Sequence, residues 1–201
     1  MFCFACTGGI GSGKSYTVRV FTALGVPAYV ADLKAKQLYD KDKSLIWRLC
    51  ELLGNEIYVD GILQKQVMAS KIFADKKLLK RVNAIVHPRL LEDFFEWRDE
   101  RVKEGTEMII YESAIFLETP LFHQIADKVI VVTAPEEVRI KRVMKRDNMQ
   151  EYQVRQRISK QWNDEKRLSM ADFIIFADGK RAVLPQILNI IEVARRLYIK
   201  E

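Results

Sequence analysis

The sequence predicts an α/β fold in which a five-stranded parallel sheet is flanked by helices. Three observations predict it. Short apolar runs, typical of buried strands, alternate with helical patterns along the chain. A glycine-rich segment, residues 8–13, separates the first apolar run from the first helical pattern. The stretch from Leu33 to about Lys103 is nearly all helical, which is too long for a simple crossover between neighbouring strands.

The individual elements follow from the same patterns. The strands are expected at Phe2–Thr7, Ala28–Ala31, Met108–Tyr111, Val129–Thr133 and Phe173–Phe176. Helices are expected at Lys14–Leu24, near Pro120–Gln124, at Glu136–Arg146 and after the Asp178-Gly179 turn. The long helical stretch is expected to be interrupted at Asp60-Gly61 and at His87-Pro88.

These elements suggest a single domain with two insertions. The core is expected at about residues 1–32, 105–134 and 168–201. A helical lobe for the substrate, about residues 33–104, would lie between the second and third strands, and a basic helical lid would cover about residues 135–167. We find no repeat and no flexible linker between these parts.

Composition narrows the class of protein. Hydrophobic residues make up 49% of the 201 residues, which is enough for a buried core. No apolar run reaches the roughly 18 residues of a membrane helix, and the first run has no basic lead, so we expect a cytoplasmic protein without a membrane partner. The net charge of +6 favours anionic ligands, either nucleic acid or small phosphates. No block of five or six like charges forms a nucleic-acid-binding arm.

Two of the three cysteines, Cys3 and Cys6, form a C-x-x-C pattern in the first predicted strand. Residues three apart on a strand point to opposite faces, so they cannot easily share a metal ion. No second pair of Cys or His lies near them. We therefore expect buried thiols in a core strand, with a metal site as the weaker alternative.

The glycine-rich segment carries a complete Walker A pattern, Gly8-x-x-x-x-Gly13-Lys14-Ser15. A loop between a strand and a helix can point several backbone N–H groups at one phosphate, and glycine permits the dihedral angles that this needs. Lys14 would reach the β- and γ-phosphates, and the Ser15 hydroxyl would hold Mg²⁺. We expect Tyr16 to pack beside the nucleotide. A chance glycine turn is the alternative, which the strand–loop–helix context disfavours.

The acceptor of the phosphate is a separate question. No Asn-Lys-x-Asp base reader of guanine switches is present, and the third strand ends in one acid, Glu112, where motors carry Asp-Glu. The chain length, the inserted lobe and the basic segment favour a kinase that uses ATP and Mg²⁺ to phosphorylate a small molecule. A nucleoside or nucleoside-monophosphate kinase is one alternative, and an ATP-dependent nucleic-acid-binding module is another.

Two acids follow predicted strands at the edge where ligands bind in open parallel sheets. Asp32 follows the second strand and is a candidate general base for an alcohol acceptor, although it could merely cap the next helix. Glu112 ends the third strand and could hold Mg²⁺ through water or orient the acceptor, with a solvated acid as the alternative. Arg142 and Arg146 share a helix face and could stabilise the transferring phosphoryl group, unless that face is simply solvated.

Several landmarks along nearly the whole chain occur together in one order. They are Thr7–Ser15, Leu24–Pro27 followed by Ala31-Asp32, His87-Pro88, Asp127–Val132, Arg142 with Arg146, Arg157–Gln161 and Ala171–Ile175. In this order they resemble the dephospho-CoA kinase family. The loop alone is shared with many kinases, but the ordered set is specific.

The resemblance implies an adenylate-kinase-like P-loop core with a helical CoA-binding lobe and a lid. It implies transfer of the ATP γ-phosphate to the ribose 3′-hydroxyl of dephospho-CoA, the last step of coenzyme A biosynthesis. Asp32 would then be the base and Arg142 a lid arginine on the phosphates, with Lys14 as the third catalytic residue. The nucleotide-binding residues would be Gly9, Gly11, Ser12, Gly13, Lys14, Ser15, Tyr16 and Arg146. We expect a monomer that does not bind nucleic acid.

On the acceptor side the expected residues are Asp32, His87 and Glu112, with a structural role as the alternative for His87. The sequence departs from the family at three places. Val30 replaces the first acid of Asp-Ala-Asp, the segment after Glu112 lacks a proline, and Ala177-Asp178-Gly179 stands where Asn-x-Gly is common. The last difference affects the expected adenine contacts.

Overall fold

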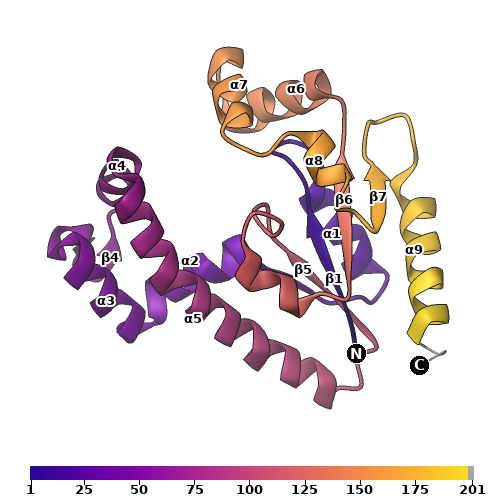
Figure 1. The fold of residues 1–201 in the computed structure, drawn as a ribbon, viewed down its shortest axis with the longest axis horizontal. Helices are drawn as coiled ribbons and strands as arrows, with labels where there is room; N and C mark the ends of the chain where they lie inside the picture. The colour runs from indigo at the N-terminus through magenta and orange to yellow at the C-terminus, as the bar shows by residue number, and fades with distance from the viewer. Residues whose placement is uncertain (199–201) are drawn as a thin grey trace. The chain divides into compact units, whose positions relative to one another are not determined.

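The computed structural model describes residues 1–198 and divides into two compact units, one of Met1–Tyr29 with Val102–Glu201 and one of Val30–Arg101. A five-stranded sheet with the order β2-β5-β1-β6-β7 forms the centre of the first unit (Figure 1). Its strands are β1 (Phe2–Thr7), β2 (Ala28–Val30), β5 (Met108–Glu112), β6 (Lys128–Thr133) and β7 (Phe173–Phe176). β1 pairs in parallel with β5 and β6, and β6 with β7. The predicted parallel sheet is confirmed, with every strand end within one residue of its expected position.

The core of the first unit surrounds β1, the middle strand. Phe4, Ala5 and Cys6 are completely buried, because strands that are covered on both faces need apolar side chains throughout. The Phe4 ring lies 6.3 Å from that of Phe21 on one helix and 6.1 Å from that of Phe173 on β7. Cys3 and Cys6 are buried in this strand and form no disulfide with a described residue, so the expected buried thiols are present.

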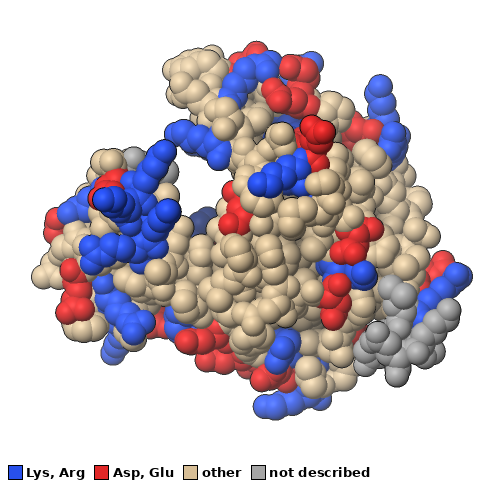
Figure 2. Space-filling view, in the orientation of Figure 1, with Lys and Arg blue, Asp and Glu red and all other residues tan. Residues whose placement is uncertain are grey.

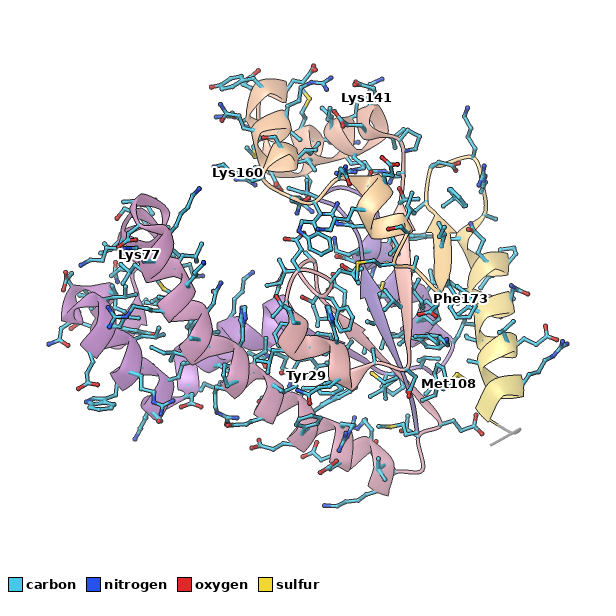
Figure 3. The ribbon with its side chains drawn as sticks, in the orientation of Figure 1. Tyr29, Lys77, Met108, Lys141, Lys160 and Phe173 are labelled. Carbon is cyan, nitrogen blue, oxygen red and sulfur yellow. The ribbon has the colours of Figure 1, made fainter. Side chains whose placement is uncertain are left out.

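Helices surround the sheet. α1 (Lys14–Ala23) packs against β5 and against α9 (Val183–Tyr198), which also contacts β7. A 3₁₀ helix, η2 (Pro120–Ile125), precedes β6. After β6 come α6 (Glu136–Asp147), α7 (Glu151–Ser159) and α8 (Asp164–Leu168). α6 and α7 pack together beyond the carboxyl ends of β1 and β6 (Figure 1). Lys141 of α6 and Lys160, which directly follows α7, are both exposed (Figure 3).

The second unit is mainly helical. Its elements are α2 (Ala31–Lys41), α3 (Lys43–Leu53), η1 (Asn55–Ile57), β3 (Tyr58–Val59), β4 (Ile62–Leu63), α4 (Lys65–Ala74) and α5 (Lys76–Lys103). Buried Leu45, Leu49 and Leu53 recur every four residues on α3, which gives the helix an apolar face. Asp42 caps α3 by accepting from the Leu45 N–H at 2.9 Å, and it also accepts from Arg89 Nε of α5 at 2.6 Å.

Of the two interruptions expected in this unit, one is present and one is not. Asp60-Gly61 does interrupt the helical stretch, but as the turn of a short antiparallel hairpin, β3–β4, that was not expected, and φ is positive at both residues. His87-Pro88 does not interrupt the helix, because α5 continues through Pro88. Proline removes a helical N–H donor, but the buried side chains on both sides, Val82, Val86, Leu90, Leu91 and Phe94, offset that loss. None of the helices in the described part of the chain is long and apolar enough to cross a membrane.

Candidate active site

The loop between β1 and α1 makes two left-handed turns at glycine. φ is 75° at Gly11 and 106° at Gly13, in a region that other residues rarely adopt. Gly13 is also the N-cap of α1, and no side chain caps the first turn of this helix. The N–H groups of Lys14, Ser15 and Tyr16 therefore lack acceptors within the helix. No acidic residue lies in this fully described turn, so the helix N-terminus favours an anion.

Side chains from the loop and from α6 enclose a small hollow of about 180 Å³. The Lys14 Nζ donates hydrogen bonds to the carbonyl oxygens of Gly8 at 2.8 Å and Gly9 at 3.3 Å, so the ammonium lies over the loop. The hollow is lined by Gly11, Gly13, Lys14, Ser15, Tyr16, Arg142, Val143 and Arg146. Six of the eight residues expected to bind the nucleotide thus face one space together with Arg142, whereas Gly9 and Ser12 are not among its lining residues.

Arg142 connects α6 to the loop and to the end of β7. Its Nη2 donates to the carbonyl oxygen of Ala177 at 2.7 Å, and its Nη1 lies 3.4 Å from the carbonyl oxygens of both Gly11 and Ser12. These contacts hold a guanidinium at the rim of the hollow. A cation at this place can stabilise negative charge that develops on a phosphoryl group.

Arg146, one turn further along α6, is paired with a carboxylate. Its Nε and Nη2 donate to the two oxygens of Asp147 at 2.7 Å and 2.9 Å. The hydrogen bonds that Arg146 donates lower the pKa of Asp147, and bonding to this carboxylate raises the pKa of Arg146. The arginine therefore stays charged, and a phosphate that binds it would compete with Asp147.

A larger cavity of about 610 Å³ adjoins the loop, a volume typical of small-molecule sites. Its lining residues are Gly13, Tyr16, Arg142, Ala177, Gly179, Lys180, Arg181, Ala182 and Val183. Tyr16 lies at this cavity with half of its surface exposed, and its role beside the nucleotide stays a prediction. Asp178 shapes the loop by accepting from the N–H groups of Lys180 and Arg181 at 2.8 Å and 2.9 Å. Residues 177–179, where this sequence differs from the family pattern, therefore form one wall of this cavity.

Glu112 is not a solvated acid. It ends β5, pairs in register with Cys6 at the end of β1 and is only 6% exposed. The pKa of the Cys6 thiol is raised to about 12, first by burial and then by the Glu112 charge, while the Lys14 charge opposes the rise. The charges of Glu112 and Lys14 thus both shift the pKa of the same thiol. The Glu112 carboxylate lies below the phosphate loop, at the carboxyl edge of the sheet.

Asp32 and His87 belong to the second unit. Asp32 is an exposed residue in the first turn of α2, whose N-cap is Val30, so the alternative in which Asp32 caps this helix is not supported. Its carboxylate is exposed and therefore open to contact with a ligand. His87 is half-buried on α5, and burial lowers the pKa of its imidazole, so the ring is mostly neutral at pH 7.

The second unit has a hollow of its own, of about 600 Å³, between α3 and α5. Arg48, Glu51, Leu52, Arg81, Ala84 and Ile85 line it. Lysines and arginines gather on the same unit around α4 and the start of α5 (Figure 2). They include Lys65, Lys71, Lys76, Lys77, Lys80 and Arg81. This surface attracts anions.

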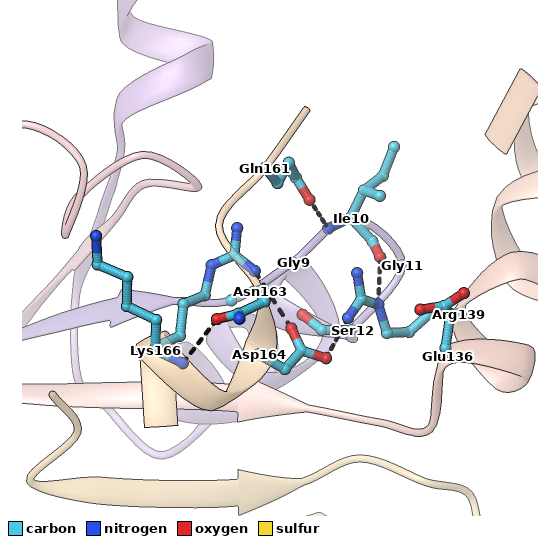
Figure 4. A network of polar contacts seen from close by, with 12 residues as sticks. Gly9, Ile10, Gly11, Ser12, Glu136, Arg139, Gln161, Asn163, Asp164 and Lys166 are labelled. Atoms are coloured by element: carbon cyan, nitrogen blue, oxygen red, sulfur yellow. Dashed lines mark hydrogen bonds and ion pairs between the residues drawn. The ribbon is translucent and has the colours of Figure 1, made fainter. Parts of the chain in front are cut away.

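A set of polar residues beneath the phosphate loop was not predicted from the sequence (Figure 4). Arg139 of α6, only 2% exposed, donates from Nε to the carbonyl oxygen of Ile10 at 3.0 Å and forms an ion pair with Asp164. Gln161 accepts from the Ile10 N–H at 2.9 Å. One signal was available: Arg139 lies beside Ile140 and on the face that carries Val143, and a charge on a buried helix face needs partners.

A magnesium ion that accompanies a nucleotide needs only one or two protein oxygens, with phosphates and water supplying the rest. The Ser15 hydroxyl lines the small hollow and fits this requirement. Glu112 lies at the adjoining strand end and could act through water. The described residues contain no group of three or more His, Cys, Asp or Glu that could hold a metal without such a ligand.

Comparison with known proteins gives consistent matches. A family model described as dephospho-CoA kinase matches residues 2–182. A dephospho-CoA kinase from Bacteroides fragilis is 38% identical over 185 residues, covering 92% of this chain and 89% of the relative. One from Porphyromonas gingivalis is 36% identical over 196 residues, covering 97% and 95%. A crystal structure of a Thermus thermophilus protein covers 96% of each chain with a TM-score of 0.82 at 25% identity.

Proposed function

The chain belongs to the dephospho-CoA kinase family, and we propose that it transfers the γ-phosphate of ATP to the ribose 3′-hydroxyl of dephospho-CoA. One observation carries the proposal: Lys14 and Ser15 of the loop and Arg142 and Arg146 of α6 line the same hollow. Transfer of a phosphoryl group depends mainly on positioning and on cations around the transferring oxygens. This hollow can provide both.

On the nucleotide side, the β- and γ-phosphates would lie against the N–H groups at the start of α1. Lys14 would leave its bonds to the Gly8 and Gly9 carbonyl oxygens for phosphate oxygens, and Arg142 would stabilise the transferring group. The base and ribose would occupy the larger cavity beside Tyr16. When bound, Mg²⁺ would neutralise phosphate charge, held by Ser15 with Glu112 acting through water.

On the acceptor side, we assign Asp32 as the base that accepts the proton of the ribose hydroxyl, with His87 as a further substrate contact. The second unit would be the CoA-binding lobe, and its basic surface suits an acceptor that carries phosphates. Arg48 and Arg81 are our candidates for holding the diphosphate of dephospho-CoA. Residues 135–167 would act as a lid that excludes water from the reaction.

The proposal is tested by measuring ADP release by the purified protein with ATP and Mg²⁺. Dephospho-CoA, AMP, CMP or no acceptor would be added in parallel. Release that depends on dephospho-CoA and yields coenzyme A is the expected result. Release with a nucleoside monophosphate, or equal release without an acceptor, would reject it. The same preparation, examined by sedimentation, tests our expectation of a monomer, and cell fractionation tests the cytoplasmic location.

Asp32→Asn tests the base. Removal of a general base typically costs a factor of about 10² to 10⁴ in turnover, whereas the ATP dissociation constant should stay unchanged. Asp40→Asn is the matched control, because Asp40 is an acid on the same helix. Near-normal turnover of Asp32→Asn would show that the base assignment is wrong. Lys14→Ala should weaken ATP binding and lower turnover together.

A further inference from the structure

The peptide units at Ile10 in the phosphate loop are held by side chains from outside the loop. The Ile10 N–H donates to Gln161 Oε1 at 2.9 Å, and its carbonyl oxygen accepts from Arg139 Nε at 3.0 Å (Figure 4). A Cβ on Gly9 would lie 2.5 Å from Arg139 Nη2. The Arg139 guanidinium therefore fills the space next to Gly9. Arg139 and Gln161, the two partners of Ile10, both lie more than 120 residues away from it in sequence.

The two buried arginines behind the loop are balanced by acids. Arg139 is paired with Asp164, whose other oxygen lies 3.2 Å from Arg167 Nη1. Arg167 is 1% exposed and is also 3.2 Å from Glu118. A buried charge without a partner is costly, so each arginine depends on these carboxylates. The segment that carries Gln161 and Asp164 therefore determines where the Arg139 guanidinium lies.

We propose that Arg139, Asp164 and Gln161 are positioning residues for ATP, which hold the Ile10 peptides so that the following N–H groups point at the phosphates. They act through the loop, because the Ile10 N–H is already bonded to Gln161. The inference deepens the proposed function and rests on it: it concerns the ATP side of the same site and not the acceptor. Its direct readout is ATP affinity, which can be measured without catalysis.

The test uses Arg139→Met, Asp164→Asn and their double variant. ATP dissociation constants are measured by calorimetry on protein whose fold is verified by circular dichroism and by its melting temperature. We expect each single variant to bind ATP about tenfold more weakly, since a hydrogen bond to a charged group is lost. The double variant should be no weaker than the singles, because both break the same contact. KM for ATP should rise and KM for dephospho-CoA should not.

Arg155→Gln is the matched control. Like Arg139, Arg155 on α7 forms ion pairs, in its case with the carboxylates of Glu136, Glu137 and Glu151. Unlike Arg139, it is exposed, and its ion pairs do not involve the phosphate loop. We expect its ATP affinity to equal that of the wild type. If folded Arg139→Met and Asp164→Asn also bind ATP like the wild type, the residues serve stability alone and the inference is wrong.

If Arg139→Met and Asp164→Asn do not fold, Gln161→Leu still tests the inference. It removes only the acceptor of the Ile10 N–H and leaves no charge unpaired. We expect ATP binding roughly threefold weaker, and unchanged affinity would overturn the inference. If the variants bind ATP more weakly but the wild type does not phosphorylate dephospho-CoA, the proposed acceptor fails and the positioning role stands.

Discussion

Gly11→Ala tests how closely the phosphate loop approaches α6. A Cβ at Gly11 would lie 2.6 Å from the Arg139 carbonyl oxygen and 2.9 Å from Val143 Cγ2. The Val143 methyl group can move slightly, but the carbonyl oxygen belongs to the helix backbone and cannot rotate away. The loop and α6 must therefore separate to accept the methyl group, which displaces the N–H groups that follow Gly11.

The magnitude has two parts. Gly11 has φ of 75°, and a left-handed alanine costs about 1–2 kcal/mol. Overpacking adds typically about 1–3 kcal/mol, so we expect a total loss of roughly 2–5 kcal/mol. Gly25→Ala separates the two parts, because Gly25 has a similar φ of 85° but no atom within 4 Å of the place that a Cβ would occupy. This control should lose only about 1–2 kcal/mol.

The assay is urea unfolding of both variants with and without ATP. Gly11→Ala should unfold at lower urea than Gly25→Ala, and ATP should stabilise it less than it stabilises the wild type. Equal losses in the two variants, with the same stabilisation by ATP, would refute the reasoning. That result would mean that the loop does not pack against the α6 backbone as described.

Three further predictions concern other parts of the chain. The hydrogen bond from the Leu45 N–H lowers the pKa of Asp42 below its ordinary 3.8. Partial burial opposes this shift, and Arg89 adds to it. The stabilisation from the Asp42 carboxylate is therefore present above that value and lost as pH falls through the lowered pKa. Because Asn caps a helix about as well as Asp, Asp42→Asn removes mainly the charge that Arg89 contacts, and it should cost about 1 kcal/mol in thermal unfolding at pH 7 and almost nothing below the lowered pKa. The Cys6 thiol, whose pKa burial raises to about 12, should resist iodoacetamide at pH 8 in native protein and react once urea unfolds it, as mass spectrometry would show. Arg81→Gln should raise KM for dephospho-CoA several-fold and leave the ATP dissociation constant unchanged; the opposite pattern in titrations would exclude Arg81 from the acceptor side.

The phosphate loop and the sheet could be predicted because their signals are local. The Walker A pattern is a contiguous run, and its meaning depends only on the strand before it and the helix after it. The central strands β1 and β5 are short apolar runs buried along nearly their whole length, and the edge strands β2 and β7 are shorter apolar runs that are partly buried, so the strands can be recognised from composition. The bounds of both features could therefore be predicted from the sequence to within one residue of their positions in the structure.

The second unit was harder to predict because its features compete with local propensity. Each strand of the β3–β4 hairpin has two residues, too few to show an alternating pattern, although Asp60-Gly61 is a common type I′ turn pair. Pro88 predicts a break in any isolated helix. The helix continues because tertiary burial of its neighbours outweighs the lost hydrogen bond, and nothing in the local sequence reports that burial.

The contacts around Ile10 could not be predicted, because hydrogen bonds between residues 129 and 151 positions apart leave no local pattern. Burial also decided the alternatives at Glu112. From sequence, a single acid at a strand end looks solvated, whereas the register of β5 against β1 places it in the core beside Cys6.

The two halves of the proposed reaction draw on different units. The residues of the nucleotide hollow and of the Ile10 contacts all belong to the first unit, whereas Asp32, His87 and Arg81 belong to the second. Substitutions in the first unit should therefore change ATP affinity, and substitutions at Asp32 or Arg81 should change turnover or acceptor affinity while ATP binding persists. The Walker A pattern identifies the loop, but Arg139, Gln161 and Asp164 define its shape.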